Sequence, residues 1–235
     1  MYTTHSRYDI YAFIHKGLRA CLTQTLLRVG RLDWTDSDDV AAAMDEVSDM
    51  LDFCRQHVAK ENTYVHAAME RRRPESATTA DHEHEHHLRD IEALEVQTFT
   101  IRRLPVLRRE DAVTTLYKAL AVFVSVNLEH MAMEEREHNR ILWDTHSDQE
   151  IMAIEHAIVA SQSPEDGQRA LRWMLTAMQP TERAGFLSVL RQSAPAEVFD
   201  GLLQMLRIHL SERDLIKLYA ALGMGRRPLD YVGMA

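Results

Sequence analysis

Residues 112–134 read AVTTLYKALAVFVSVNLEHMAME. Leu116 and Leu120 lie one helical turn apart, and His130 and Glu134 continue the same face at helical spacing. Burying a carboxylate costs much free energy unless the carboxylate has a partner. The segment therefore predicts a core helix that carries an imidazole and a carboxylate into the interior of a helical protein.

The composition of the whole chain favours an all-helical fold. Its 235 residues include only 8 glycines and 6 prolines, which is too few for a loop-rich β-sandwich or a disordered chain. Lys and Arg number 27 and Asp and Glu number 36, so the net charge is −9 with neutral histidines. Because non-specific nucleic-acid binding needs a basic face, we expect no nucleic-acid partner.

Cysteine content and apolar runs indicate the compartment. Cys21 and Cys54 are the only cysteines, and two cysteines do not make a disulfide scaffold. Residues 1–7 lack the charged-then-apolar pattern of a secretory signal. The longest apolar run, residues 119–126, is too short to span a bilayer. The sequence thus predicts a cytoplasmic protein with free thiols and no membrane segment.

Helical periodicity predicts four long helices, over residues 7–29, 37–72, 80–103 and 110–144. Gly30 ends the first of them, and Pro74 and Pro105 end the second and the third. Long helices with short connections are typical of an up-down-up-down four-helix bundle. We expect this bundle to form a domain of residues 1–146.

The remainder of the chain, residues 147–235, has shorter predicted helices. Helix start signals built on Ser or Pro recur near Ser163, Pro180, Ala194 and Ser211. We therefore expect a small helical C-terminal appendage. A protein partner or a second copy of the chain would bind through these residues.

Four of the 13 histidines begin the pattern His-x-x-x-Glu. On a helix this spacing places an imidazole and a carboxylate on one face, where both can reach one metal site. Two pairs fall within the apolar faces of their helices: His57 with Glu61, and His130 with Glu134. His66 begins a third pair, but it is rotated by about 100° from its apolar face, and we expect it to lie off the core.

Two further segments supply histidines. His15 lies on the apolar face of the first predicted helix. At the histidine-rich start of the third predicted helix, the phase of the downstream apolar residues places His84 on the core face and His87 at its flank. A competing register, with His82 and His86 facing the core one turn apart, stays open because sequence places helix starts poorly.

In an up-down bundle these side chains share one level near one end. The predicted set contains no thiolate and consists of His15, His57, Glu61, His84, His87, His130 and Glu134. Imidazoles and carboxylates without thiolate suit iron, manganese or zinc. A structural zinc site has four ligands and is closed. This larger set therefore predicts a pair of ions with a position left for an external ligand.

The ordered set resembles the hemerythrin-like, or HHE cation-binding, family over about residues 7–145. The resemblance implies a bundle around two iron ions of a non-haem centre, with manganese or zinc as possible substitutes. The resemblance implies that His15 and His57 bind one ion. It implies that His84 and His130 bind the other ion, with His87 as an additional candidate. Glu61 and Glu134 would bridge the two ions.

The sequence departs from the oxygen-carrying members of that family at two places. Its last pair is His-x-x-x-Glu rather than a longer spacing to an aspartate, and Ala80 stands one turn before His84, where the carriers have a second histidine. Reversible oxygen carriage is therefore disfavoured. The resemblance implies binding or sensing of O2 or NO at an open iron position. Two alternatives stay open: a di-iron enzyme of stress response or of iron–sulfur or NO chemistry, and a metal-stapled interaction module.

Four polar side chains are predicted near the ligands. Asn127 precedes His130 by one turn and is a candidate hydrogen-bond donor to a bound diatomic ligand. Tyr8, Tyr11 and Tyr64 lie on the predicted ligand faces and are candidates to orient imidazoles. Ordinary packing with the hydroxyl at the rim is the simpler interpretation of the tyrosines.

Overall fold

The computed structural model describes residues 7–224. These residues form helices joined by short turns, and no strand occurs among them. The prediction of an all-helical protein is confirmed for this part of the chain. Residues 1–6 and 225–235 lie outside the described residues. They include the start of the first predicted domain, the end of the second, and most of residues 1–7, which the signal prediction concerned.

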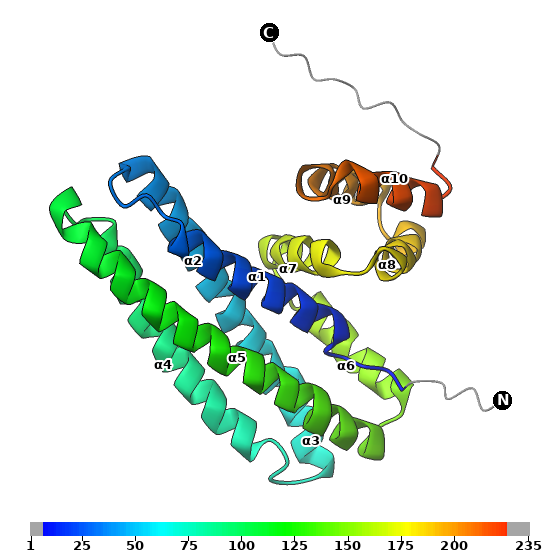
Figure 1. Cartoon of the computed structure of the whole chain (residues 1–235). Coiled ribbons are helices and arrows are strands. Elements are labelled where there is room, and N and C mark those ends of the chain that lie inside the picture. Colours follow the sequence, from blue (N-terminus) through cyan, green and yellow to red (C-terminus); the bar gives the residue numbers. More distant parts are fainter. Residues whose placement is uncertain (1–6, 225–235) are drawn as a thin grey trace.

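Four long helices run side by side with alternating direction (Figure 1): α1 (Ala12–Gly30), α2 (Ser37–Lys60), α4 (Thr78–Ile101) and α5 (Arg109–Thr145). A short 3-10 turn, η2 (Val106–Arg108), precedes α5. α1 and α4 each pack against both α2 and α5. Their apolar faces meet in one buried cluster. Cys21 and Cys54 are free thiols within this cluster, as expected for cysteines that pack as small apolar side chains.

The segment Val106–Thr145 is also long and apolar enough, by length and composition, to cross a membrane. Core helices of soluble proteins pass the same test. Here the buried face of α5 packs against α1 and α4 and carries His130 and Glu134.

The second predicted helix is not a continuous α-helix. α2 passes into a π-helix, η1 (Glu61–His66), which continues as α3 (Ala67–Arg72). In a π-helix each backbone hydrogen bond joins residues i and i+5, so these two residues lie one turn apart on the helix. His66 therefore shares a face with Glu61, and the prediction that His66 lies off the core is wrong, since its side chain is buried.

A second cluster closes the end of the long helices where α3 lies. α6 (Asp148–Ala160) begins at a capping box formed by Ser147 and Glu150. Its Ile151 is fully buried in a cluster with Tyr11 and Leu142. α6 lies within residues 147–235, which the sequence analysis predicted as the C-terminal appendage, but it packs against η1 and the end cluster rather than in the core of the helices that follow it.

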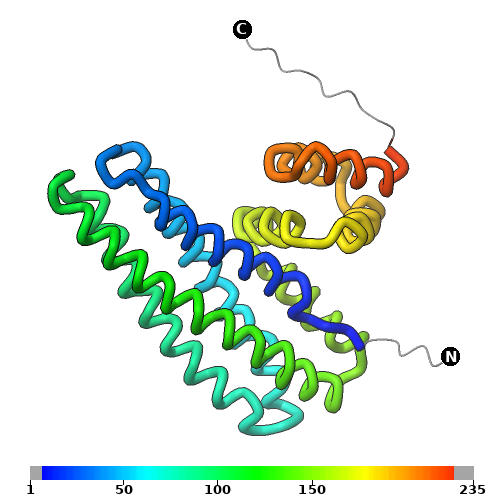
Figure 2. The backbone as a smooth tube through the Cα atoms, viewed as in Figure 1, coloured from blue at the N-terminus to red at the C-terminus, as the bar shows by residue number. Residues whose placement is uncertain are grey.

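The last four helices have a core of their own (Figure 2, yellow to red): α7 (Pro164–Ala177), α8 (Pro180–Ser193), α9 (Ala196–His209) and α10 (Glu212–Ala221). We call α7–α10 the appendage. The predicted start signals are confirmed, because Ser163 and Ser211 cap α7 and α10 and Pro180 stands in the first turn of α8.

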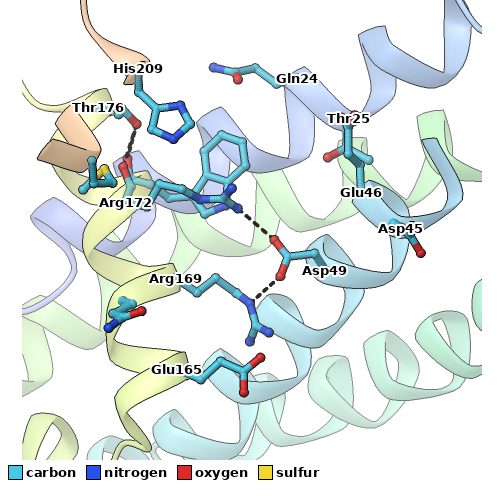
Figure 3. Close-up of a pocket in the computed structure, with 13 residues that line it drawn as sticks. Gln24, Thr25, Asp45, Glu46, Asp49, Glu165, Arg169, Arg172, Thr176 and His209 are labelled. Atoms are coloured by element: carbon cyan, nitrogen blue, oxygen red, sulfur yellow. Dashed lines mark hydrogen bonds and ion pairs between the residues drawn. The ribbon is translucent and has the colours of Figure 1, made fainter. Parts of the chain in front are cut away.

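α7 joins the appendage to the long helices. It packs along α1 at Gly17, where an added Cβ would lie 3.0 Å from the backbone nitrogen of Met174. The close approach therefore favours glycine. On the α2 side, Asp49 accepts hydrogen bonds from Arg169 Nε at 2.6 Å and from Arg172 Nη2 at 2.8 Å (Figure 3).

Candidate metal centre

Glu61 and Glu134 lie buried among the four long helices. Their exposed fractions are 3% and 0%, and none of their carboxylate oxygens has a hydrogen-bond partner in the described residues. Burial alone would raise the pKa of both carboxyls, but the surrounding imidazoles outweigh burial and lower both pKa values. Two ionised carboxylates buried together require positive charge, which protonated histidines or metal ions supply.

The first ligand set lies on the side of α1 and α2. Four donor atoms lie within 4.8 Å of one another here, from His15, His57, Glu61 and Glu134. His57 Nε2 is 3.1 Å from Glu61 Oε1, and His15 Nε2 is 3.5 Å from Glu134 Oε2. Two imidazoles and two carboxylates are thus arranged to hold one ion.

The second ligand set lies on the side of α4 and α5. Its four donor atoms, again within 4.8 Å of one another, come from Glu61, His84, His130 and Glu134. His84 Nε2 is 3.4 Å from Glu61 Oε2, and His130 Nε2 is 3.3 Å from Glu134 Oε1. Each carboxylate therefore turns one oxygen to each set, which is what a carboxylate bridging two ions needs.

The outward nitrogens of three imidazoles are held by oxygen atoms. The pairs, each through Nδ1, are His15 with Glu135 (3.1 Å), His84 with Asn62 (2.6 Å) and His130 with Glu83 (2.6 Å). Metal-ligating histidines nearly always have such a partner on the nitrogen that does not bind the ion, because it fixes the tautomer and the ring orientation. The Nε2 atoms face the carboxylates, and those of His84 and His130 also lie 2.9 Å from each other.

Protonated histidines balance the carboxylates in the metal-free protein. Burial lowers the pKa of His15, but its hydrogen bond to Glu135 and the nearby carboxylates of Glu61 and Glu134 outweigh burial and raise that pKa to about 9. Burial also lowers the pKa of His130, and the interaction with Glu134 raises it to about 9. Both rings are charged at neutral pH, so an ion that binds here has to displace their protons.

His87, the remaining predicted ligand, lies beside the two sets and belongs to neither. Its ring packs edge-on against His130 with 4.7 Å between centroids, and neither of its nitrogens has a hydrogen-bond partner in residues 7–224. Burial and the nearby His130 lower its pKa to about 4, so the ring is neutral. His82 and His86 are exposed, and the register with His84 on the core face is the one that the structure has.

A small cavity adjoins His87, His57, His84 and His130. Its other walls are mainly apolar and include Leu18, Leu22, Val58 and Met131. About 10 Å³ is open to the centre of a water-sized molecule, which is room for about one such molecule. Asn127 also lines the cavity, but its Nδ2 already donates to the backbone oxygen of Phe123 at 2.8 Å.

Two buried histidines at this site were not among the predicted ligands. His66 and His138 offer donor atoms that lie within 4.8 Å of each other and of Glu134. The four-residue spacing of His130, Glu134 and His138 was a usable signal for His138. His66 had no such signal, because a regular α-helix would turn it away.

The predicted tyrosines have separate roles. Tyr11 orients an imidazole, since its hydroxyl lies 3.1 Å from Nδ1 of His138, although His138 was not a predicted ligand. The Tyr8 hydroxyl donates to Glu155 of α6 instead. Tyr64 lines a surface groove beside α6.

A wide groove lies elsewhere, between the appendage and α1 and α2 (Figure 3). It has a volume of about 650 Å³. Its two arginines, Arg169 and Arg172, are both bound to Asp49. The groove thus marks the seam along which the appendage docks.

Comparison with family models, with curated proteins and with solved structures finds no match to this chain. The hemerythrin-like resemblance therefore rests on the residues quoted above. The geometry itself supports metal binding, because imidazoles from all four long helices converge on two buried carboxylates whose oxygens have no hydrogen-bond partner in the described residues.

Proposed function

We propose that this chain is a non-haem di-iron protein, built on a hemerythrin-like four-helix bundle in the cytoplasm, that binds or senses O2 or NO. The supporting observation is that two ligand sets share Glu61 and Glu134, each carboxylate turning one oxygen to each set. Donors of this kind, without thiolate, suit iron, with manganese or zinc as substitutes. Bound iron would supply the electrons for a diatomic ligand.

The residues around the cavity limit what can reach the ions. Leu18, Leu22 and Val58 give it apolar walls, and its size admits a diatomic molecule but no organic substrate. His87 is neutral, and neither of its nitrogens has a hydrogen-bond partner among residues 7–224, so it can donate one hydrogen bond to a ligand held there. The small cavity favours binding or sensing of a diatomic ligand over an enzyme that acts on organic molecules.

One observation favours an additional interaction role. Side chains on the outer surfaces of α8, α9 and α10 are apolar and exposed: Val189, Val198, Ile208 and Ile216. A protein partner or a second copy of the chain would cover such side chains. This role would add to metal binding, because these residues lie outside the helices that hold the ligand sets.

Metal content and optical absorption test the proposal. The protein is loaded anaerobically with Fe(II), dialysed, and analysed before and after exposure to O2 or NO. We expect two irons per chain and a spectral change with each gas. A reversible change would indicate binding, and immediate irreversible oxidation would indicate sensing or catalysis.

The control is a pair of matched double variants. Glu61→Ala/Glu134→Ala should lose iron, whereas Glu165→Ala/Glu197→Ala, which removes two acidic residues of the appendage, should keep it. Less than one iron per chain in the wild type, unchanged in the first double variant, would contradict the proposal.

A further inference from the structure

His66 has the construction of a metal ligand although it lies outside both ligand sets. Its side chain, at the end of η1, is 2% exposed. Its Nδ1 lies 2.6 Å from Asp81 Oδ1, and its Nε2 is buried without a hydrogen-bond partner in the described residues. His15, His84 and His130 are held in the same way, by an oxygen on Nδ1. A histidine that served only packing would have no reason to bury an unpaired nitrogen, which costs free energy.

The neighbours of His66 belong to the second set. Its ring stacks on that of His84, with 5.0 Å between centroids and 7° between planes. Its donor atom also groups with Glu134 and His138. The same oxygen of Glu134, Oε1, faces both groups. It lies 3.3 Å from His130 Nε2 and 3.7 Å from His138 Nδ1. The group of His66 therefore borders the second set and shares its carboxylate.

α4 leaves room for a ring that comes from another helix. Ala80, one turn before His84, is buried and has only a methyl side chain. His66 reaches from η1 across to Asp81, the residue next to Ala80, and lies against His84. A larger side chain at position 80 would compete for this space on the face of α4.

We propose that His66 is a ligand of the second ion, the one held by His84 and His130, and that the π-helix places it there. The inference rests on the proposed function, because it needs two ions in the centre. His138 is a positioning residue: it touches Glu134 and packs edge-on against the His66 ring, with 5.2 Å between centroids.

Anaerobic titration of the full chain with Fe(II) tests this role. His66→Ala is compared with His82→Ala, which removes a histidine of α4 whose side chain is 73% exposed. The wild type and His82→Ala should bind two ions. His66→Ala should bind the first ion with wild-type affinity, and the dissociation constant of the second should rise at least tenfold. In Co(II)-loaded protein the visible bands should intensify, because one ion loses a ligand.

A second variant guards against misfolding. His66→Asn keeps a side-chain donor for Asp81 but has no Nε2, and it should lose the second ion in the same way. Each variant is first checked for folding: without metal it should melt at the temperature of the metal-free wild type. If a variant that passes this check binds both ions with wild-type affinity, the inference is overturned. A wild type that binds fewer than two ions is a different result, which overturns the proposed function itself.

Discussion

At the scale of single residues, the imidazoles of His15 and His84, which face the carboxylates, differ from that of His87 in ring orientation and not in burial. His15 and His84 each present one nitrogen to an oxygen outside the centre and the other to the two carboxylates. His87 is equally buried, yet neither of its nitrogens is held by a partner in the described residues. We therefore expect the oxygen partners to affect metal binding through the rings that they orient.

Glu135 is the outer partner that a substitution can test most cleanly. It lies 3.1 Å from Nδ1 of His15 and accepts hydrogen bonds from Arg19 at 2.6 and 3.0 Å. Glu135→Gln keeps the size but loses the charge, so we expect Fe(II) affinity to fall about 10–100-fold. Glu137→Gln, on the same helix and bound to Arg140, should leave it unchanged. Competition with a chelator measures the Fe(II) affinity of both variants. If Glu135→Gln binds Fe(II) as tightly as Glu137→Gln does, Glu135 does not have this role.

The raised pKa values of His15 and His130 predict how metal binding depends on pH. Both pKa values lie near 9 in the metal-free protein, above the ordinary 6.5. Each ring must lose its proton to bind an ion, so affinity should rise from about pH 6.5 to 9 and level off above that. The same ion pairs stabilise the metal-free fold fully below pH 6.5, and that stability is lost as the pH rises through 9.

Chelator competition and thermal melting at stepped pH check the two opposite trends. Affinity should increase and the melting temperature of the metal-free protein should decrease over the same pH window. An affinity that does not change between pH 6.5 and 9 would show that the two histidines hold no displaceable protons.

At the scale of elements, helical periodicity predicted the long helices well. The last of them was predicted over 110–144 and is found at Arg109–Thr145. Apolar faces also placed His57 and His130 correctly with their carboxylates, because a four-residue spacing on a regular helix fixes the face. The π-helix could not be predicted in this way, because no residue type marks it and tertiary contacts of His66 with Asp81 and His84 accompany it.

The π-helix is equivalent to one extra residue in a continuous helix from α2 to α3. Deleting Thr63, which is exposed, would leave Glu61 and His66 four residues apart, on one face of a regular α-helix. We therefore expect the deletion variant to fold, to keep its far-ultraviolet circular dichroism and to bind the same number of metal ions.

The matched control is deletion of Ala93, an exposed residue within the regular helix α4. This deletion rotates the following segment by about 100° with no π-turn to absorb the change, and the apolar face of α4 would leave the core. Loss of folding in both deletion variants would mean that η1 is more than a single inserted residue.

At the scale of the whole molecule, α1 connects the candidate metal centre to the appendage. His15 turns inward to the carboxylates, Lys16 binds Glu182 of α8 at 2.6 Å, and Gly17 touches the backbone of α7. Three consecutive residues thus contact both parts. The appendage contacts α1 and α2, which carry His15 and His57, through Lys16, Gly17 and Asp49, and these residues are outside both ligand sets. Its docking should therefore affect stability more than metal binding.

A glycine pair tests this division. At Gly17 an added Cβ would lie 3.0 Å from the backbone nitrogen of Met174 and 3.2 Å from the carbonyl carbon of Trp173. Because backbone atoms cannot rotate away as a side chain does, α7 would have to shift. We expect Gly17→Ala to lower the free energy of unfolding by about 1–3 kcal/mol.

Gly185 in α8 provides the matched control, since an added Cβ there would meet no atom within 4 Å. Gly185→Ala should raise the free energy of unfolding by about 0.5–1 kcal/mol, because alanine favours a helix interior over glycine. Urea unfolding measures both variants, and Fe(II) titration should find two ions in each. If Gly17→Ala is as stable as Gly185→Ala, α7 does not depend on the close approach at Gly17. If Gly17→Ala instead loses an ion, the appendage controls the position of His15, and the centre and the appendage form one cooperative unit.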